Sequence, residues 1–268
     1  MKQWVKITLW SLFGLLVLVL LVLTQQAQDD IPTEKPEIEV HVEGEAHFIT
    51  EEEILSDLDF HRFWKKGMRS GDLPIGKIEA YLKRISQVKD ARVYRKLGGE
   101  WRIEVTTRTP IARIFNEQGQ TYYLDDEGVK MKISDLHAAR ILVVTGDVPD
   151  RFEGENLSEI INNDSLKSIR KLDDIYRISN YVCDDPLFHS LIGQIHLETN
   201  GDFVLIPLVG DQKVVFGSAL TEKEVAEKFK KLKIFYEEAM PYEGWDAYKE
   251  ISLKYEDQIV CKKKETDG

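Results

Sequence analysis

The stretch ARVYRKLGGEWRIEVTT, residues 91–107, decides how the first folded part of this chain is organised. Its second half alternates Trp101, Ile103 and Val105 with polar residues, which is the period-2 pattern of a strand that buries one face. Two adjacent glycines separate this strand from a second strand-like segment at residues 91–97. The stretch therefore predicts a β-hairpin.

Three elements precede the hairpin and complete one folding unit. Residues 38–44 alternate apolar and polar side chains as a half-buried strand does. Thr50 and Glu53 have the spacing of a capping box and predict the start of a short helix. A second helix is predicted to begin near Pro74, with its apolar residues on one face. The order strand, helix, helix, strand, strand predicts a small α+β module.

An uncharged apolar run, residues 7–23, lies upstream of this module. Its length is close to the ~20 residues that a helix needs to span a bilayer. Lys2 and Lys6 precede the run, whereas Lys35 is the first basic residue after it. The positive-inside bias therefore predicts that residues 1–6 are cytoplasmic and that the chain after the helix is outside.

A cleaved signal peptide is the alternative interpretation of the apolar run. Its hydrophobic region would be about 7 to 15 residues long and would end at a small-residue cleavage site. The run at residues 7–23 is longer, which favours a retained anchor. Residues 24–37 hold two prolines, show no apolar periodicity and are predicted as a linker.

Composition narrows the classes of function. The 268 residues include 36 basic and 47 acidic ones, and the net charge of −11 disfavours binding to the phosphate backbone of nucleic acids. Cys183 and Cys261 are far apart and lack the spacing of a zinc site. One disulfide bond between them is possible, but two free thiols are favoured.

A strand-rich second domain is predicted after residue 108. Helical spacing of apolar residues predicts one or two helices over residues 156–182 and a charged amphipathic helix over residues 219–240. The predicted strands cover residues 111–115, 121–124, 129–133, 141–144, 192–198, 203–207, 213–216, 247–255 and 258–262.

We find no sequence motif that supplies catalytic chemistry. Phosphate-binding loops, zinc-binding helix motifs and nucleophile elbows do not occur, and the histidines are scattered. We therefore predict no catalytic residue, no cofactor and no metal. The acidic pairs Asp173-Asp174 and Asp184-Asp185 are expected to be solvated, since adjacent helix residues point in different directions.

Several short patterns occur along the chain in a specific order. They are Val40-x-Val42-x-Gly44, Ile85-x-x-Val88-x-x-Ala91, Arg108-x-Pro110-Ile111-Ala112, Tyr123-Leu124-Asp125-x-x-Gly128 and Ile251-Ser252-Leu253-Lys254-Tyr255. In this order they resemble the polypeptide-transport-associated (POTRA) module, and the domain that follows it, of the FtsQ/DivIB family of bacterial cell-division proteins.

The resemblance implies a division of the chain and a function. The implied parts are a cytoplasmic tail (1–6), a transmembrane helix (7–23), a linker (24–37), a POTRA module (38–108) and an FtsQ-type β domain (109–264). The implied function is a noncatalytic scaffold in the cytoplasmic (inner) membrane, enriched at the division site. It would link early and late septal proteins through FtsB-like and FtsL-like partners and help to control septal peptidoglycan synthesis. A membrane-anchored extracytoplasmic cell-wall hydrolase and an envelope-assembly chaperone are the alternatives.

The last two predicted strands form a candidate partner-binding edge. An open edge strand presents unpaired backbone groups, so an extended partner segment can add to the sheet. The predicted contact residues are Tyr255, Gln258, Ile259, Val260 and Cys261. A proline at position 260 is expected to weaken binding by removing one backbone donor. The alternative is an edge that the lysines at 262–264 protect from pairing.

Overall fold

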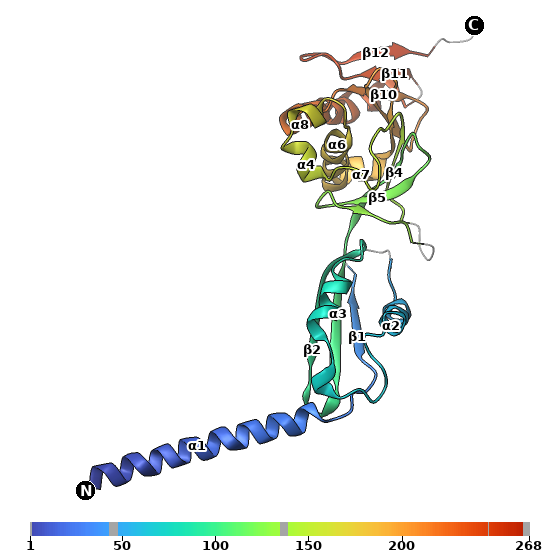
Figure 1. Ribbon diagram of the computed structural model, residues 1–268. Coiled ribbons are helices and arrows are strands. Elements are labelled where there is room, and N and C mark those ends of the chain that lie inside the picture. The colour runs from blue at the N-terminus through green and yellow to red at the C-terminus, as the bar shows by residue number, and fades with distance from the viewer. Residues whose placement is uncertain (1, 43–47, 135–138, 246, 265–268) are drawn as a thin grey trace. The chain divides into compact units, whose positions relative to one another are not determined.

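The computed structural model describes residues 2–42, 48–134, 139–245 and 247–264, and divides the chain into two compact units (Figure 1). The boundary lies between Thr107 and Arg108. Each unit has its own sheet and its own hydrophobic core. The structure confirms the α+β class that the sequence predicts.

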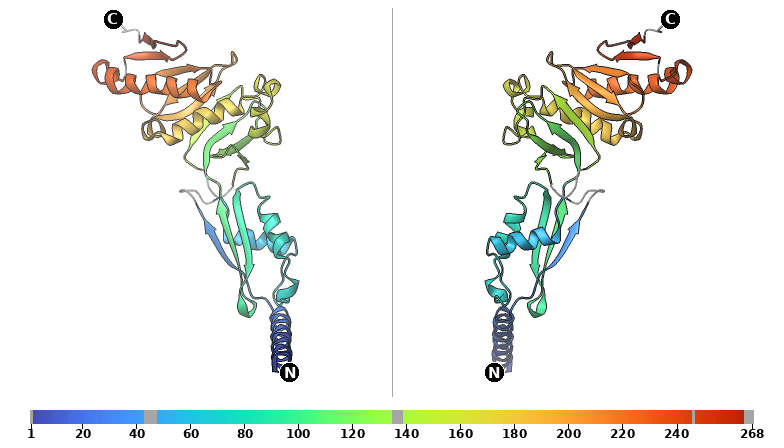
Figure 2. Two further views of the ribbon diagram at one scale, coloured as in Figure 1. Left: turned by 90° about the vertical axis from the view of Figure 1, so that its left-hand side faces the viewer. Right: turned by 90° about the vertical axis from the view of Figure 1, so that its right-hand side faces the viewer.

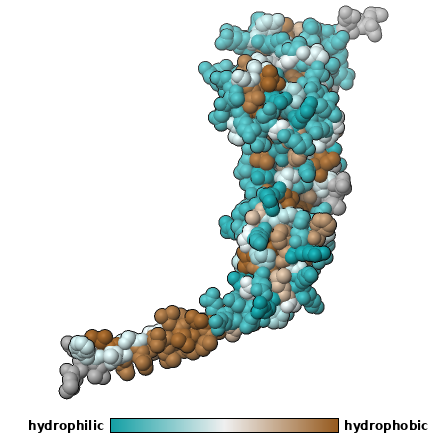
Figure 3. Space-filling model, in the orientation of Figure 1, coloured by the Kyte–Doolittle hydropathy of each residue, from teal (hydrophilic) through white to brown (hydrophobic). Residues whose placement is uncertain are grey.

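The first unit begins with a single long helix, α1 (Lys2–Asp29). Residues Lys6–Asp29 have the length and composition of a membrane-spanning helix. Their apolar side chains are exposed and form the brown band on α1 in Figure 3. The apolar N-terminal helix is thus confirmed, but it continues to Asp29. Residues 24–29, predicted as part of a linker, are helical.

A three-stranded sheet with two helices forms the rest of the first unit. Its strands are β1 (Glu37–His41), β2 (Val88–Arg95) and β3 (Trp101–Thr107). Its helices are α2 (Glu51–Phe60), α3 (Ile75–Leu82) and the short turns η1 (Ser70–Asp72) and η2 (Leu97–Gly99). β3 is central, parallel to β1 and antiparallel to β2.

Local sequence explains the ends and the inner face of these elements. The capping box is present, since the Thr50 hydroxyl accepts from the Glu53 N–H at 3.2 Å and the Thr50 N–H donates to the Glu53 carboxylate at 2.9 Å. Ile54 on α2 and Ile78 on α3 are fully buried in one core with Ile103 on β3.

A nine-stranded mixed sheet forms the second unit, in the order β12-β11-β10-β9-β8-β7-β4-β5-β6. The strands are β4 (Pro110–Phe115), β5 (Thr121–Asp125), β6 (Lys130–Met131), β7 (Leu142–Gly146), β8 (Ile192–Leu197), β9 (Phe203–Pro207), β10 (Lys213–Gly217), β11 (Tyr248–Ser252) and β12 (Val260–Lys263).

The helices of this unit share one core with the sheet (Figure 2). They are α4 (Leu157–Ile161), α5 (Asp164–Lys167), α6 (Leu172–Asp184), α7 (Pro186–Leu191), α8 (Glu222–Ile234), the π-helix η3 (Phe235–Ala239) and α9 (Met240–Glu243). Parallel neighbours require a long crossover connection. The chain from α4 to α7 supplies it between β7 and β8, and the chain from α8 to α9 supplies it between β10 and β11.

Two expectations about acidic residues are wrong. Asp173 and Asp174 are buried, because Arg177 lies one helical turn away and forms ion pairs with both, at 3.0 Å to Asp173. Asp185 is not merely solvated either: its carboxylate caps α7 and pairs with Lys233 at 2.8 Å. The region predicted to hold one or two helices, residues 156–182, contains three helix starts.

Candidate partner-binding site

β12 is the last strand of the nine-stranded sheet. It pairs with β11 in antiparallel register, with Ile251 opposite Cys261 and Ser252 opposite Val260. In the ranges that the structure describes, no strand pairs with its other side. Both strands are shorter than predicted: β11 ends at Ser252, and β12 begins at Val260.

Successive residues of β12 point their backbone groups toward and away from β11. The Lys264 N–H donates to the Ala247 carbonyl oxygen at 3.0 Å, on the β11 side. The N–H and C=O of one strand residue point to the same side, and those of the next residue point to the opposite side. Val260 and Lys262 therefore face β11 as Lys264 does, and the residues between them face outward.

The outward-facing backbone groups belong to Cys261 and Lys263. The hydrogen bonds of β11 agree with this register. The Leu253 N–H, one residue beyond β11, donates to the Val215 carbonyl oxygen of β10 at 2.9 Å. The backbone groups of the preceding residue, Ser252, therefore face β12, where Ser252 lies opposite Val260. A proline at Val260 would therefore remove a bond to β11. The structure moves the test of partner binding from Val260 to the two outward-facing residues.

Each lysine after Cys261 forms an ion pair with an acid of the same unit. The pairs are Lys262 with Glu250 at 2.8 Å, Lys263 with Glu243 at 2.9 Å and Lys264 with Asp211 at 3.2 Å. The hydrogen bond to Glu243 raises the pKa of Lys263. Exposed pairs of this kind contribute only about 0–1 kcal/mol. A partner carboxylate can thus replace any of these three acids at little cost.

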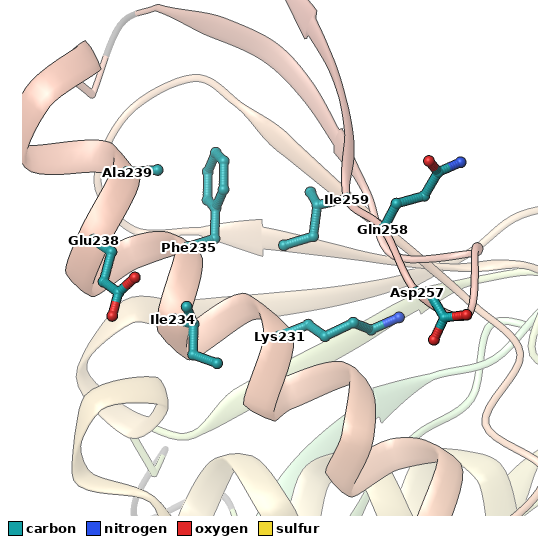
Figure 4. A pocket seen from close by; sticks show the side chains of 8 residues that line it. All are labelled: Lys231, Ile234, Phe235, Glu238, Ala239, Asp257, Gln258 and Ile259. Carbon is teal, nitrogen blue, oxygen red and sulfur yellow. The ribbon is translucent and has the colours of Figure 1, made fainter.

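A groove of about 460 Å³ lies between the end of α8 and the loop that joins β11 to β12 (Figure 4). It is lined by Lys231, Ile234, Phe235, Glu238, Ala239, Asp257, Gln258 and Ile259. In Figure 4 the Ile259 side chain reaches toward Phe235, whereas Gln258 points away from the helix. The groove is therefore apolar in its middle and charged at its ends.

The helix side of this groove was not identified from the sequence. The amphipathic pattern left open whether Phe235 or Tyr236 belongs to the buried stripe. The π-helix η3 places Tyr236 and Met240 in the core and leaves Phe235 half-buried beside the groove. Burial raises the pKa of Tyr236 to about 12. Two adjacent aromatic residues at the end of the stripe were the available signal.

Three predicted contact residues lie at the edge. Ile259 lines the groove and packs against the core. Val260 is 39% exposed. Cys261 is half-buried on the core side, and burial raises its thiol pKa. The structure thus brings Ile259, Val260 and Cys261 together, and their contact with a partner stays a prediction.

The other two predicted contact residues lie in the loop and not in a strand. Tyr255 is 51% exposed, and its carbonyl oxygen accepts from the Lys231 ammonium at 2.6 Å. Gln258 is exposed one residue before the groove residue Ile259. Both can reach a partner only beside the strand and not as part of its ladder.

In the part of the chain that the structure describes, the potential metal ligands do not cluster and the two cysteines are not paired. Over the described ranges, no group of three or more His, Cys, Asp or Glu side chains is placed to hold a metal ion. Cys183 and Cys261 are both free. Burial raises the pKa of Cys183 to about 11, so its thiol is protonated and a poor nucleophile at neutral pH.

Comparison with known proteins identifies one family. Residues 109–262 match the family model described as FtsQ/DivIB, C-terminal related. The match covers more than half of the chain and includes the groove and most of β12. No curated protein matches the chain.

Proposed function

The chain belongs to the FtsQ/DivIB family of cell-division proteins, and from this premise we propose that it is a noncatalytic scaffold of the division septum. It holds FtsB-like and FtsL-like proteins at the septum and thereby helps to control septal peptidoglycan synthesis. Depletion of the protein should leave cells long and undivided. Normal septa after depletion would contradict the proposal.

We assign the POTRA module to residues 38–108 and the FtsQ-type β domain to residues 109–264. The element order of the first unit, with β3 between β1 and β2, supports the first assignment. The family match over residues 109–262 supports the second.

The proposed topology places residues 1–6 in the cytoplasm, α1 across the membrane, and residues 38–108 and 109–264 in the periplasm. Its support is the apolar helix α1, together with the lysines at positions 2 and 6 before it. A periplasm-active reporter fused after Gly268 should be active, and one fused at Met1 inactive. The reverse pattern would contradict this orientation.

The open edge of β12 is the observation that carries the proposed partner binding. An extended partner segment would exchange backbone bonds with Cys261 and Lys263, whose groups face outward. An apolar partner side chain would enter the groove between Phe235 and Ile259. A partner carboxylate would compete with the acids that now pair with the lysines after Cys261.

Two variants at one position separate the backbone contact from the side chain. Lys263→Ala removes the ion pair with Glu243 but keeps the N–H, whereas Lys263→Pro removes both. The full-length protein in detergent would be titrated with the extracytoplasmic segment of the FtsB-like protein from the same organism. A lost backbone bond should weaken Kd about three- to tenfold beyond the alanine variant.

Equal Kd values for the two variants would overturn the strand-addition model. Circular dichroism would check that both variants remain folded. Tyr255→Ala, which alters only the loop, tests the side-chain contact separately, and full binding by that variant would remove Tyr255 from the site.

A further inference from the structure

The tip of the β2–β3 hairpin exposes a large apolar side chain. Leu97 is 84% exposed, which is more than any side chain of the apolar run in α1. It lies in the turn η2, where Gly98 and Gly99 both have positive φ. Nothing in the described part of the first unit covers this leucine.

The same tip is packed against the chain that leaves α1. The Gln28 side-chain amide donates to the Lys96 carbonyl oxygen at 3.5 Å, and the Glu34 N–H donates to the Gly99 carbonyl oxygen at 3.3 Å. A Cβ on Gly99 would lie 2.4 Å from the Pro32 carbonyl oxygen, so only glycine allows this approach. Figure 1 shows the tip beside the end of α1.

Helix length places this contact close to the membrane surface. From Leu23, the last residue of the apolar run, to Gln28 the helix rises about 7.5 Å. The headgroup layer on each side of a bilayer is about 5–8 Å thick. The apolar run at 7–23 is about 26 Å long as a helix, against a hydrocarbon core of about 30 Å, which draws flanking residues inward. Leu97 is thus held at headgroup height.

Five acids lie at the end of α1, in the segment after it or next to the tip, and Glu34 and Glu100 are exposed. Three of them are paired with bases of the module: Asp29 with Arg95 at 3.1 Å, Asp30 with Arg69 at 3.4 Å and Glu37 with Lys96 at 2.6 Å. The neighbouring loop adds two exposed lysines, Lys65 and Lys66, which favour anionic headgroups. Met68 of that loop accepts from the Thr33 N–H at 2.7 Å, which ties the loop to the same segment.

We propose that the hairpin tip at Leu97 lies in the headgroup layer of the bilayer that α1 crosses. The module then has a second membrane contact besides its helix, made by an exposed leucine between glycines and basic residues. Its partner is the lipid surface itself, reached through continuity with the membrane-spanning helix.

Site-directed spin labelling of the full-length chain tests this proposal. Cys183 and Cys261 are replaced by alanine, and a nitroxide is attached at Leu97→Cys. The matched control carries the label at His41→Cys. This exposed position lies at the end of β1 that is away from the hairpin tip, where His41 pairs with Thr106 of β3. Both proteins are reconstituted in vesicles of phosphatidylcholine and phosphatidylglycerol, and circular dichroism verifies the fold.

Collision rates with two relaxing agents give the result. Oxygen concentrates in lipid and a nickel complex stays in water, so a label in the headgroup layer gains oxygen contact and loses nickel contact. The oxygen-to-nickel ratio at position 97 should exceed that at position 41 several-fold. Equal ratios, or a fall in both collision rates at position 97, which indicates burial in protein, would overturn the proposal.

Discussion

Replacing Arg108 by methionine should destabilise the second unit strongly, because it leaves a buried carboxylate without its counter-charge. The Arg108 guanidinium lies 2.8 Å from one carboxylate oxygen of Asp125, and Asp125 has no exposed side-chain surface. The other Asp125 oxygen accepts from the backbone N–H groups of Glu127 at 3.0 Å and Val129 at 2.6 Å. Removing one partner of a buried pair typically costs about 3–5 kcal/mol.

The stability that Arg108→Met loses should depend on pH in a defined direction. Burial raises the pKa of Asp125, and Arg108 opposes that rise, so the pKa is higher still in the variant. A folded-state pKa above the unfolded value means that the folded state binds the proton more tightly. Stability then falls as pH rises from the unfolded to the folded pKa, by at most about 1.4 kcal/mol per pH unit. The difference in unfolding free energy between the unaltered protein and the variant is therefore largest at neutral pH and decreases on acidification.

Urea unfolding of the full-length protein in detergent, followed by circular dichroism at pH 7 and pH 5, measures both effects. Arg113→Met is the matched control, since the Arg113 guanidinium stacks 5.1 Å from the Phe115 ring and its loss should cost only about 0.5–1 kcal/mol. Adding Asp125→Asn to Arg108→Met should restore part of the stability, because the amide oxygen still accepts backbone bonds without a charge. A cost no larger than that of Arg113→Met, or no rescue, would refute the reasoning.

Three further predictions concern local geometry. Thr50→Ala removes the cap of α2 and should cost about 1 kcal/mol in urea unfolding, whereas Thr50→Ser should cost much less. Lys233→Met removes the hydrogen bond that lowers the pKa of Asp185, so carboxyl NMR titration should show that pKa rising toward its ordinary value; an unchanged titration would contradict the pair. Gly146→Ala should destabilise more than Gly201→Ala in the same unfolding assay, because both have positive φ but only at Gly146 would the new Cβ lie 2.1 Å from a carbonyl oxygen of β8; equal losses would contradict this.

Local patterns in the sequence predicted the elements that short-range forces determine. The apolar run of α1, the capping box at Thr50 and the alternation along β3 each depend on neighbours within a few residues. The order of strands and helices in the first unit was predicted for the same reason. The resemblance to FtsQ/DivIB also rested on residue order, and the match over residues 109–262 confirms it.

Tertiary structure alone decided which groups face one another across the candidate site. A period-2 pattern identifies the two faces of a strand but not the strand it pairs with. The register that turns the backbone N–H and C=O of Cys261 outward therefore follows from the pairing with β11. The π-helix that places Phe235 at the groove adds a residue to one turn, and the sequence showed two adjacent aromatic residues there without deciding which of them is buried. Asp173 is buried although acids favour water, because its ion pair with Arg177 at 3.0 Å offsets part of the cost of desolvation. The sequence by itself thus determined the elements and the family, whereas contacts between distant segments determined burial, register and the open edge.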